Sequence, residues 1–200
     1  MADRPIIFSA PMIRALLDGR KTQTRRLAWG DLIAEPANKT YVHRHEGSLQ
    51  GWSRPSSWRG VKPGDNLWVR ETFWGCDFRE TGELPIVVYA ERHHGKSYDH
   101  PGNVMIAAPR FGHISAIHMP KKASRLTLTV TATRVERLQE ISEDDAVAEG
   151  CHRVREWLAS AMFRELWDAL HGAGAWAANP EIVALAFSVA RENIDAKEAT

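Results

Sequence analysis

The feature that most constrains the fold is the stretch 126–137, in which apolar residues alternate with threonine. Leu126, Leu128 and Val130 fall on one side of an extended chain, and the threonines between them fall on the other. Side chains alternate between the two faces of a β-strand, and β-branched threonine favours that conformation. The pattern therefore predicts a long strand with one apolar face, which needs neighbouring strands to pair with and a core to cover that face.

Shorter apolar segments are expected to supply the remaining strands. They share an alternating or continuous apolar pattern bounded by turn residues, and they cover 5–8, 66–73, 84–90 and 182–189. A turn is expected at 62–65, where Pro63 is followed by glycine, and another at Asn179, which precedes a proline. No internal repeat is present. The sequence therefore predicts several short strands around one long strand.

Three helices are expected along the chain. The first covers 12–17, with Ser9 as its N-cap and Gly19 as the left-handed residue that ends it. The second is a short helix that Ser142 opens with a capping-box pattern. The third covers about 155–170, where apolar residues recur at helical spacing. Its predicted apolar stripe consists of Trp157, Ala161, Leu166 and Leu170, with Phe163 nearby.

These elements predict an α+β fold, namely a small mixed β-barrel of five to six strands with two to three flanking helices. We expect a single domain over 1–190 and a polar C-terminal tail over 191–200 that frays. Two stretches, 27–60 and 91–112, lack periodicity, and we expect long loops or insertions there. A doubly wound sheet is not expected, because strands and helices do not alternate regularly and no glycine-rich loop follows a strand.

Charge is spread unevenly along the 200 residues, although the formal net charge is only +1. Residues 1–70 contain 12 Lys and Arg against 6 Asp and Glu, whereas residues 135–200 contain 6 against 13. A basic front half suits an anionic ligand such as a nucleotide or RNA, and the acidic back half disfavours tight nonspecific binding to long nucleic acid. The two cysteines form no disulfide framework, and no apolar run is long enough to span a bilayer. A soluble, cytoplasmic protein without a membrane partner is therefore expected.

The segment 19–26, directly after the first expected helix, combines four cations with two threonines, one glutamine and one glycine. A charge run is ordinarily a solvated surface, and cations at a helix C-terminus complement the helix dipole. A second interpretation depends on Lys21 and the threonines beside it. A hydroxyl becomes a useful nucleophile when a desolvated lysine takes its proton or stabilises its charge. The segment is therefore either a solvated face or part of a catalytic site.

Several motifs recur in a fixed order along most of the chain. They cover 7–12, 19–26, 62–65, 67–71, 117–120, 123–125, 128–133, 141–150 and 179–180. Together they resemble the ASCH domain, a PUA-like β-barrel family, and in particular the ASCH proteins common in phages and prophages. The resemblance implies a PUA-like barrel. It also implies an activity, because small bacterial members of the family are amidohydrolases that remove the acetyl group from N4-acetylcytidine.

The resemblance implies a catalytic set of one lysine, one threonine and one glutamate, which correspond to Lys21, Thr24 and Glu149. Thr24 is the candidate nucleophile, and Lys21 either accepts its proton or, while charged, stabilises the oxyanion. Glu149 either activates water or protonates the leaving amine. The pKa of Lys21 is expected to be lowered by the arginines of the same segment. Taken alone, Glu149 is also consistent with an ordinary helix-surface carboxylate.

A base-sized pocket needs aromatic walls and groups that read the edge of the base. Candidate substrate-binding residues are Arg20, Arg26, Trp68, Arg70, Glu71, His118 and Asn179, with Trp74 and Trp176 as further candidate walls. Each also has a structural interpretation: the tryptophans as core residues, Arg70 and Glu71 as members of an ion pair, and His118 as a turn residue. No cofactor is expected. No metal is expected either, because the local pairs lack the spacing of zinc ligands; these pairs are His43/His45, His93/His94 and Cys151/His152.

The sequence leaves three function classes open. The first is an amidohydrolase acting on an N4-acylated cytosine nucleoside or a related modified nucleobase. The second is a noncatalytic ASCH module that binds single-stranded RNA or DNA in the same cleft, with a ribonuclease variant in which His118 or Lys21 is the acid or base. The third is a phage structural or interaction protein without chemistry in a pocket.

Overall fold

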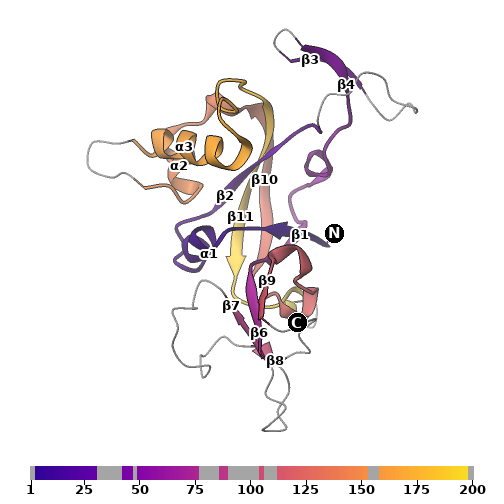
Figure 1. Cartoon of the computed structure of the whole chain (residues 1–200), viewed down its shortest axis with the longest axis vertical. Helices are drawn as coiled ribbons and strands as arrows, with labels where there is room; N and C mark the ends of the chain where they lie inside the picture. Colours follow the sequence, from indigo (N-terminus) through magenta and orange to yellow (C-terminus); the bar gives the residue numbers. More distant parts are fainter. Residues whose placement is uncertain are drawn as a thin grey trace. The chain divides into compact units, whose positions relative to one another are not determined.

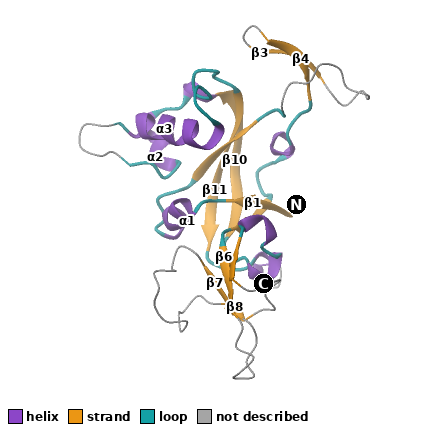
Figure 2. Ribbon diagram, viewed as in Figure 1, coloured by secondary structure: helices purple, strands orange, loops and turns teal. Residues whose placement is uncertain are grey.

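The computed structural model describes residues 3–30, 42–46, 49–76, 86–89, 104–105, 112–152 and 158–197. The fold is α+β, as the sequence predicts (Figures 1 and 2). The strands are β1 (Asp3–Ile7), β2 (Gln23–Leu27), β3 (Val42–Glu46), β4 (Leu49–Ser53), β5 (Asn66–Arg70), β6 (Phe73–Cys76), β7 (Ile86–Tyr89), β8 (Val104–Met105), β9 (Gly112–Ile114), β10 (Thr127–Arg137) and β11 (Glu181–Ala190). The helices are α1 (Ala10–Leu17), α2 (Glu143–Ala148), α3 (Ala159–His171) and α4 (Ile194–Lys197). None of the helices in the described ranges is long and apolar enough to cross a membrane.

The main sheet is mixed and has five strands in the order β1-β5-β10-β11-β2. Strand β1 runs parallel to β5, β10 runs antiparallel to β5, and β11 runs antiparallel to β2. The long strand predicted over 126–137 is confirmed as β10, and the strand predicted over 182–189 is confirmed as β11. Closure into the predicted barrel would require the edge strands β1 and β2 to pair. The described strands show no such pairing, so this sheet is not closed.

The chain forms two compact units. The first unit contains Met1–Gly19, Gly64–Thr129 and Ser188–Thr200, and the second unit contains Arg20–Pro63 and Val130–Phe187. Strands β10 and β11 are long enough that each runs from one unit into the other. Each unit has its own buried residues and its own buried ion pair.

In the first unit, α1 matches its sequence pattern. Ile13 and Leu16 are buried, which is the spacing of one helix face, and Pro11 lies in the first turn. Gly19 adopts a left-handed φ of +72°, as predicted for the residue that ends this helix. Ser9 occupies the N-cap position of α1, as predicted, but its side chain makes no capping hydrogen bond.

The strand predicted over 66–73 is divided into two in the first unit. Strand β5 ends at Arg70, and Phe73 begins β6 in a separate antiparallel sheet of order β8-β7-β6-β9. Phe73 is fully buried with Ile114 and Met119, so the small sheet has its own apolar cluster. The polar tail predicted to fray includes α4, and Ile194 is fully buried there. Burial of Ile194, together with the hydrogen bonds of Asn193 to the Lys121 and Ser124 carbonyls, anchors this part of the tail.

In the second unit, α2 and α3 pack against β11. Ala146 of α2 and Phe163 of α3 share one buried cluster with Ile182 of β11. Helix α3 begins at Ala159, later than predicted, and its buried line is Ala159, Phe163 and Trp167. The predicted stripe is therefore wrong at Leu170, which is 64% exposed, because β11 contacts a different side of the helix. Trp157 lies outside the described residues.

The predicted loop 27–60 contains regular structure. Strands β3 and β4 form an antiparallel hairpin in which Val42 pairs with Ser53. Beside it, Trp29 forms a β-bridge with Pro55, and the Ser56 amide donates to the Ala28 carbonyl. The sequence missed this hairpin because its polar strands lack the apolar alternation that marks a strand. In the other predicted loop, the structure describes β8 and Gly112, and the rest of 91–112 lies outside the described residues.

Candidate active site

Strand β2 of the second unit carries polar residues where a buried strand is normally apolar. Gln23, Thr24 and Arg25 are all buried. Just before the strand, the Thr22 amide donates to the Ala148 carbonyl at 2.8 Å, and the Phe187 amide donates to the Thr22 carbonyl at 2.9 Å. The segment 19–26 is therefore held between the end of α2 and β11, with Lys21, Gln23, Thr24 and Arg25 buried and Arg20 and Thr22 exposed.

Lys21 and Glu149 meet in this interior. Both are almost fully buried, at 2% and 4% exposure. The Lys21 Nζ donates to Glu149 Oε2, to the Glu149 carbonyl and to the Gln23 carbonyl, each at 2.8 Å. Three acceptors match the three protons of an ammonium group. Glu149 is the C-cap of α2, whose first turn is capped by Ser142 as predicted, so the carboxylate is placed by a helix end and is not on an open surface.

Arg25 holds the other oxygen of the same carboxylate. Its Nη1 donates to Glu149 Oε1 at 3.2 Å and to Gln23 Oε1 at 2.6 Å. Its Nη2 donates to Glu136 Oε1 at 2.9 Å and to Asp145 Oδ2 at 3.0 Å. The Nε of Arg25 is buried and has no hydrogen-bond partner among the described residues. A buried unpaired N–H costs about 1–3 kcal/mol, which the four bonds of the guanidinium fork offset.

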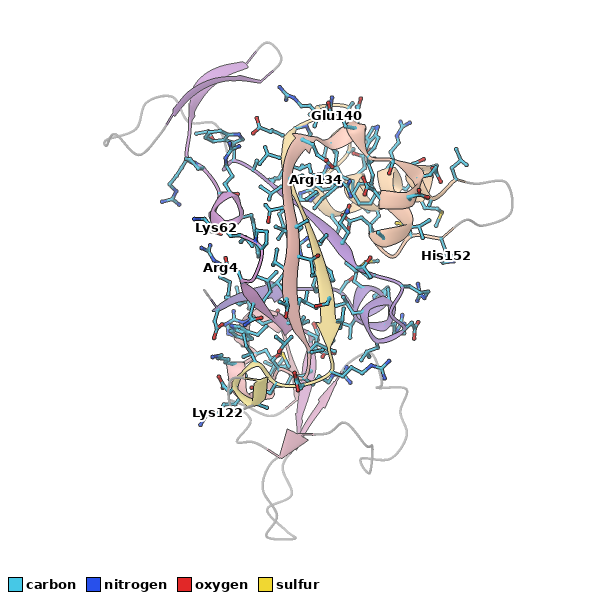
Figure 3. All side chains as sticks on the ribbon, turned by 180° about the vertical axis from the view of Figure 1, so that it is seen from behind. Arg4, Lys62, Lys122, Arg134, Glu140 and His152 are labelled. Atoms are coloured by element: carbon cyan, nitrogen blue, oxygen red, sulfur yellow. The ribbon has the colours of Figure 1, made fainter. Side chains whose placement is uncertain are left out.

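Asp145 links this buried cluster to the surface. It accepts a hydrogen bond from Gln23 Nε2 at 3.0 Å and one from Arg134 Nη2 at 3.1 Å. Arg134, labelled in Figure 3, projects from β10, and half of its side chain is exposed. Partial burial raises the pKa of Asp145, but the hydrogen bonds from Gln23 and Arg134 and the charge of Arg25 outweigh burial and lower it. Asp145 is therefore an anion at neutral pH and holds Arg25 in place.

Burial is the main reason why the pKa of Lys21 is lowered below its ordinary value. The charge and hydrogen bond of Glu149 oppose this shift, and the positive charge of Arg26 adds to it. The predicted direction is confirmed, but the predicted cause was incomplete, because burial exceeds the effect of the neighbouring arginines. Burial also raises the pKa of the nearby Cys151 thiol to about 11, so that this cysteine stays protonated and is not a nucleophile at neutral pH.

Thr24 lies on the opposite face of β2 from this cluster. In the register of β2 with β11, Arg25 pairs with Ala184 and Thr24 pairs with Leu185. Paired residues share a face, and Ala184 belongs to the buried cluster beneath α2 and α3. Thr24 is buried, and the three acceptors described for the Lys21 amine belong to Gln23 and Glu149. The structure thus brings two of the three predicted catalytic residues together and leaves Thr24 on the other side of the strand.

The two other predicted cations of the segment lie nearer the surface. Arg20 is exposed. Arg26 is partly buried, and its guanidinium carbon lies 5.8 Å from the ring centroid of Trp58. A second pair of this kind is close in sequence, where the guanidinium carbon of Arg59 lies 4.6 Å from the ring centroid of Trp29. Such distances are in the range of cation–π contact, so the described residues of the second unit include two arginine–tryptophan pairs.

Four predicted substrate-binding residues belong to the first unit and take part in its own contacts. The Arg70 guanidinium lies 4.5 Å from the Trp68 ring centroid and donates to the Ile117 carbonyl at 3.2 Å. Arg125 donates to both carboxylate oxygens of Glu71, at 2.9 and 2.8 Å. His118 is exposed at the end of a short 3₁₀ turn, Ala116–His118. Glu71 is therefore a member of an ion pair, but with Arg125, whereas the described contacts of Arg70 are with Trp68 and Ile117. His118 is a turn residue, as its structural interpretation predicted.

Asn179 and Trp176 of the second unit are held by structural contacts. Asn179 adopts a left-handed φ of +43°, and its Oδ1 accepts a hydrogen bond from the Gln139 amide at 2.9 Å. Asparagine tolerates this conformation better than most residues, which explains its place in the turn. Trp176 packs edge-on against Phe163, with ring centroids 6.3 Å apart. The side chain of Trp74 lies outside the described residues.

Metal ligands were not predicted, and within the described ranges no three His, Cys, Asp or Glu residues are arranged to hold a metal ion. His43 and His45 lie in β3, but their side chains are outside the description, as are His93 and His94. The sequence did not single out Arg25, Asp145 and Glu136 as parts of the site. One signal was available, namely a run of polar residues between two apolar segments. Such a run is normally a solvated loop, and it can be buried only if acidic residues from elsewhere in the chain pair with its cations.

Comparison of the chain with known proteins identifies no related protein. No protein-family model, no curated protein and no solved structure matches the chain. The functional interpretation therefore depends on the geometry of the second unit and on the resemblance of the sequence motifs.

Proposed function

We propose that this protein is an amidohydrolase that removes the acyl group from N4-acetylcytidine or a related N4-acylated cytosine nucleoside, and that it is a PUA-like member of the ASCH family. The observation that carries the proposal is the buried Lys21–Glu149 pair. The two residues are 128 positions apart, and Lys21 Nζ lies 2.8 Å from Glu149 Oε2. Burying two charges costs desolvation free energy, and apolar residues of similar size would fill the core at least as well. A buried pair of titratable groups therefore favours a functional role.

The pair supports both proton transfers that amide hydrolysis needs. A proton that moves from Lys21 Nζ to Glu149 Oε2 converts two buried ions into two neutral groups without changing the net charge. The neutral amine of Lys21 can then accept the proton of the attacking hydroxyl. The protonated Glu149 can give its proton to the exocyclic nitrogen of cytosine as the C–N bond breaks. After both steps the lysine is an ammonium and the glutamate a carboxylate again.

The nucleophile in the proposal is Thr24 or a water molecule. Thr24 attack would form an acyl ester on its hydroxyl, and water would then release acetate. The family resemblance supports Thr24, whereas its place on the other face of β2 supports direct attack by water. The two routes differ in whether an acetyl group is ever attached to the protein.

The activity is tested by incubating the purified protein with N4-acetylcytidine and following cytidine and acetate by chromatography. The variants Lys21→Met and Glu149→Gln are expected to lose about 10²–10⁴-fold in rate, the usual contribution of a general acid or base. Lys122→Met and Glu165→Gln, at exposed positions, serve as matched controls and are expected to keep the wild-type rate. No turnover of any acylated cytosine nucleoside by the wild type would overturn the proposal.

The nucleophile is tested with Thr24→Val, which keeps the shape of the side chain and removes its hydroxyl. Thr131→Val, at an exposed position of β10, is the control. If Thr24 attacks, the variant is inactive and mass spectrometry of rapidly quenched wild type finds an acetyl group on the Thr24 peptide. If water attacks, Thr24→Val keeps most of the rate and no adduct forms.

A second candidate function is a noncatalytic module that binds single-stranded RNA or DNA. The observation that favours it is the presence of two arginine–tryptophan pairs, Arg26 with Trp58 and Arg59 with Trp29. Aromatic rings stack on bases and arginine contacts phosphate, which together give binding that weakens as salt rises. Single-stranded oligonucleotides at low and high salt test this function, and a gel of the RNA after incubation detects the ribonuclease variant. Binding without turnover of acylated nucleosides would favour this candidate.

A further inference from the structure

The strongest additional feature of the second unit is the way in which Glu149 is divided between two cations. Its Oε2 accepts from Lys21 at 2.8 Å, and its Oε1 accepts from Arg25 at 3.2 Å. The Lys21 amine also bonds the carbonyl of Glu149, so the residue is held at three points. The carboxylate cannot rotate about its last bond without losing one of these contacts.

Arg25 is held by several contacts in addition to its hydrogen bond with Glu149. No part of its side chain is exposed. Its two terminal nitrogens donate to Gln23, Glu136 and Asp145 in addition to Glu149. Its guanidinium also lies 5.8 Å from the ring centroid of Phe163 in α3. A guanidinium with this many partners has one orientation. Because its Nη1 donates to Glu149 Oε1, that orientation fixes the position of the Glu149 carboxylate.

We propose that Arg25 is a positioning residue of the amidohydrolase site: it holds one oxygen of Glu149 so that the other faces the amine of Lys21. The inference rests on the proposed amide hydrolysis. Arg25 does not act on substrate itself, because its remaining donor, Nε, is buried and does not reach solvent. The role is distinct from that of Lys21, which exchanges a proton with Glu149, because an arginine side chain does not give up its proton in this pH range.

A purely structural role for Arg25 predicts a different outcome. In that case Arg25 only attaches β2 to α2, and its loss lowers stability without changing the titration of Lys21 or the rate of the folded protein. The charged groups around the pair include Arg25 and Arg26, and the nearby Cys151 thiol is neutral, so the pH dependence of the rate and the titration of Lys21 are expected to respond to Arg25 if Arg25 orients Glu149. The rate and its pH profile therefore separate the two roles, whereas stability alone does not.

The test compares Arg25→Gln and Arg25→Lys with the matched control Arg134→Gln. Arg134 contacts the same Asp145 and Glu136 as Arg25, but it lies at the surface and does not contact Glu149. We expect Arg25→Gln to lower kcat by about 100-fold with little change in KM, since misplacement of a reacting group by about 1 Å has this effect. Arg25→Lys restores the charge without the fork and is expected to recover part of kcat. Arg134→Gln is expected to keep the wild-type kcat and pH profile.

A second readout does not need turnover. The Lys21 Nζ is followed by lysine-selective ¹⁵N NMR as pH is raised, in wild type, Arg25→Gln and Arg134→Gln. A pKa of Lys21 that differs from wild type in Arg25→Gln and is unchanged in Arg134→Gln supports the positioning role. This result does not depend on turnover, so it stands even if the wild type hydrolyses no acylated nucleoside and the proposed function fails. If Arg25→Gln does not fold, Glu136→Gln takes its place, because it removes one anchor of Arg25 at a partly exposed position. Wild-type kcat and an unmoved Lys21 titration in the folded variants overturn the inference.

Discussion

Each unit contains a buried glutamate paired with a cation, and the two pairs differ in their chemistry. In the first unit, both oxygens of Glu71 accept from Arg125, at 2.9 and 2.8 Å, in a fork-to-fork geometry. In the second unit, the oxygens of Glu149 are divided between Lys21 and Arg25. An arginine retains its proton, whereas a desolvated lysine can lose one. The two pairs thus differ in whether the cation can give up a proton, and this difference is the reason why the second pair, and not the first, is proposed as a catalytic site.

The largest expected difference between the two pairs is in activity. Lys21→Met removes the group that exchanges a proton and is expected to reduce hydrolysis of N4-acetylcytidine by about 10²–10⁴-fold. Arg125→Met breaks the other pair, and the folded fraction of this variant is expected to keep the wild-type kcat. Initial rates, corrected for the folded fraction from circular dichroism, measure both. Equal loss of kcat in the two variants would remove the distinction between the pairs.

Stability is expected to respond similarly in both units. Removal of one partner leaves a buried charge without its counterion, which costs about 3–5 kcal/mol of the free energy of unfolding. Lys21→Met and Arg125→Met should both show this loss in urea denaturation. The double variant Lys21→Met with Glu149→Gln should lose less than the sum of its two single variants, because no unpaired carboxylate remains. Additive losses would mean that Lys21 and Glu149 are not coupled.

The pH dependence is expected to come from the second unit. The pKa of Lys21 in the folded chain is lowered from 10.5, chiefly by burial. Between the lowered pKa and 10.5 the unfolded chain holds a proton that the folded chain has lost, so the free energy of unfolding rises with pH in this window. Lys21→Met should remove this rise.

The pH profile of kcat/KM reports whether the reaction needs the proton that Lys21 and Glu149 share. A rate that falls with pH through the lowered pKa of Lys21 is expected, because both the transfer of that proton to Glu149 and the stabilisation of the oxyanion by the ammonium need it. A rate that rises through the same pKa would mean that the neutral amine acts as the base while Glu149 carries no proton. A rate that does not change in this range would contradict each of these roles of Lys21.

Backbone strain gives a smaller effect in both units. Gly19 has a φ of +72° in the first unit, Gly172 has a φ of +100° and a ψ of 157° in the second, and a Cβ at either position would meet no atom within 4 Å. Alanine at Gly19 should therefore cost about 1–2 kcal/mol from the positive φ alone. Alanine at Gly172 should cost at least as much, about 1–3 kcal/mol, because its backbone lies in a region that only glycine normally occupies. Gly30→Ala, where the φ is ordinary and the nearest atom is 3.6 Å away, is the control and should be near neutral. Urea denaturation of the three variants measures the costs.

The smallest expected effect concerns Asp145 at the edge of the buried cluster. Its pKa is lowered below 3.8, because the hydrogen bonds from Gln23 and Arg134 outweigh partial burial. A lowered carboxyl pKa stabilises the fold above the unfolded value, and this contribution is lost as pH falls through the folded value. Thermal melts between pH 5 and pH 2 should therefore fall more steeply for wild type than for Asp145→Asn, with the pH window limited to about pH 4 and below. Parallel curves would mean that Asp145 contributes nothing by its charge.

Local patterns predicted much of the fold because each depends on neighbouring residues only. The alternation in 127–137 produced β10, the left-handed glycine ended α1 at Gly19, and Ser142 capped α2. The errors at α3 and at the β3–β4 hairpin have different causes. Helix α3 buries a different line of residues from the predicted one, because β11 decides which side is covered, and the hairpin β3–β4 has no apolar alternation to reveal it.

For the site, the sequence by itself determined which chemical groups are available, and its motifs were enough to select Lys21, Thr24 and Glu149 as candidates. Only the tertiary structure decided which of them meet. The end of α2 brings Glu149 to Lys21 across 128 positions, and the register of β2 against β11 turns Arg25 toward that carboxylate and Thr24 away from it. Propensity and capping act within a few residues, whereas the pairing of two distant charges depends on strand register and burial, which no local pattern contains.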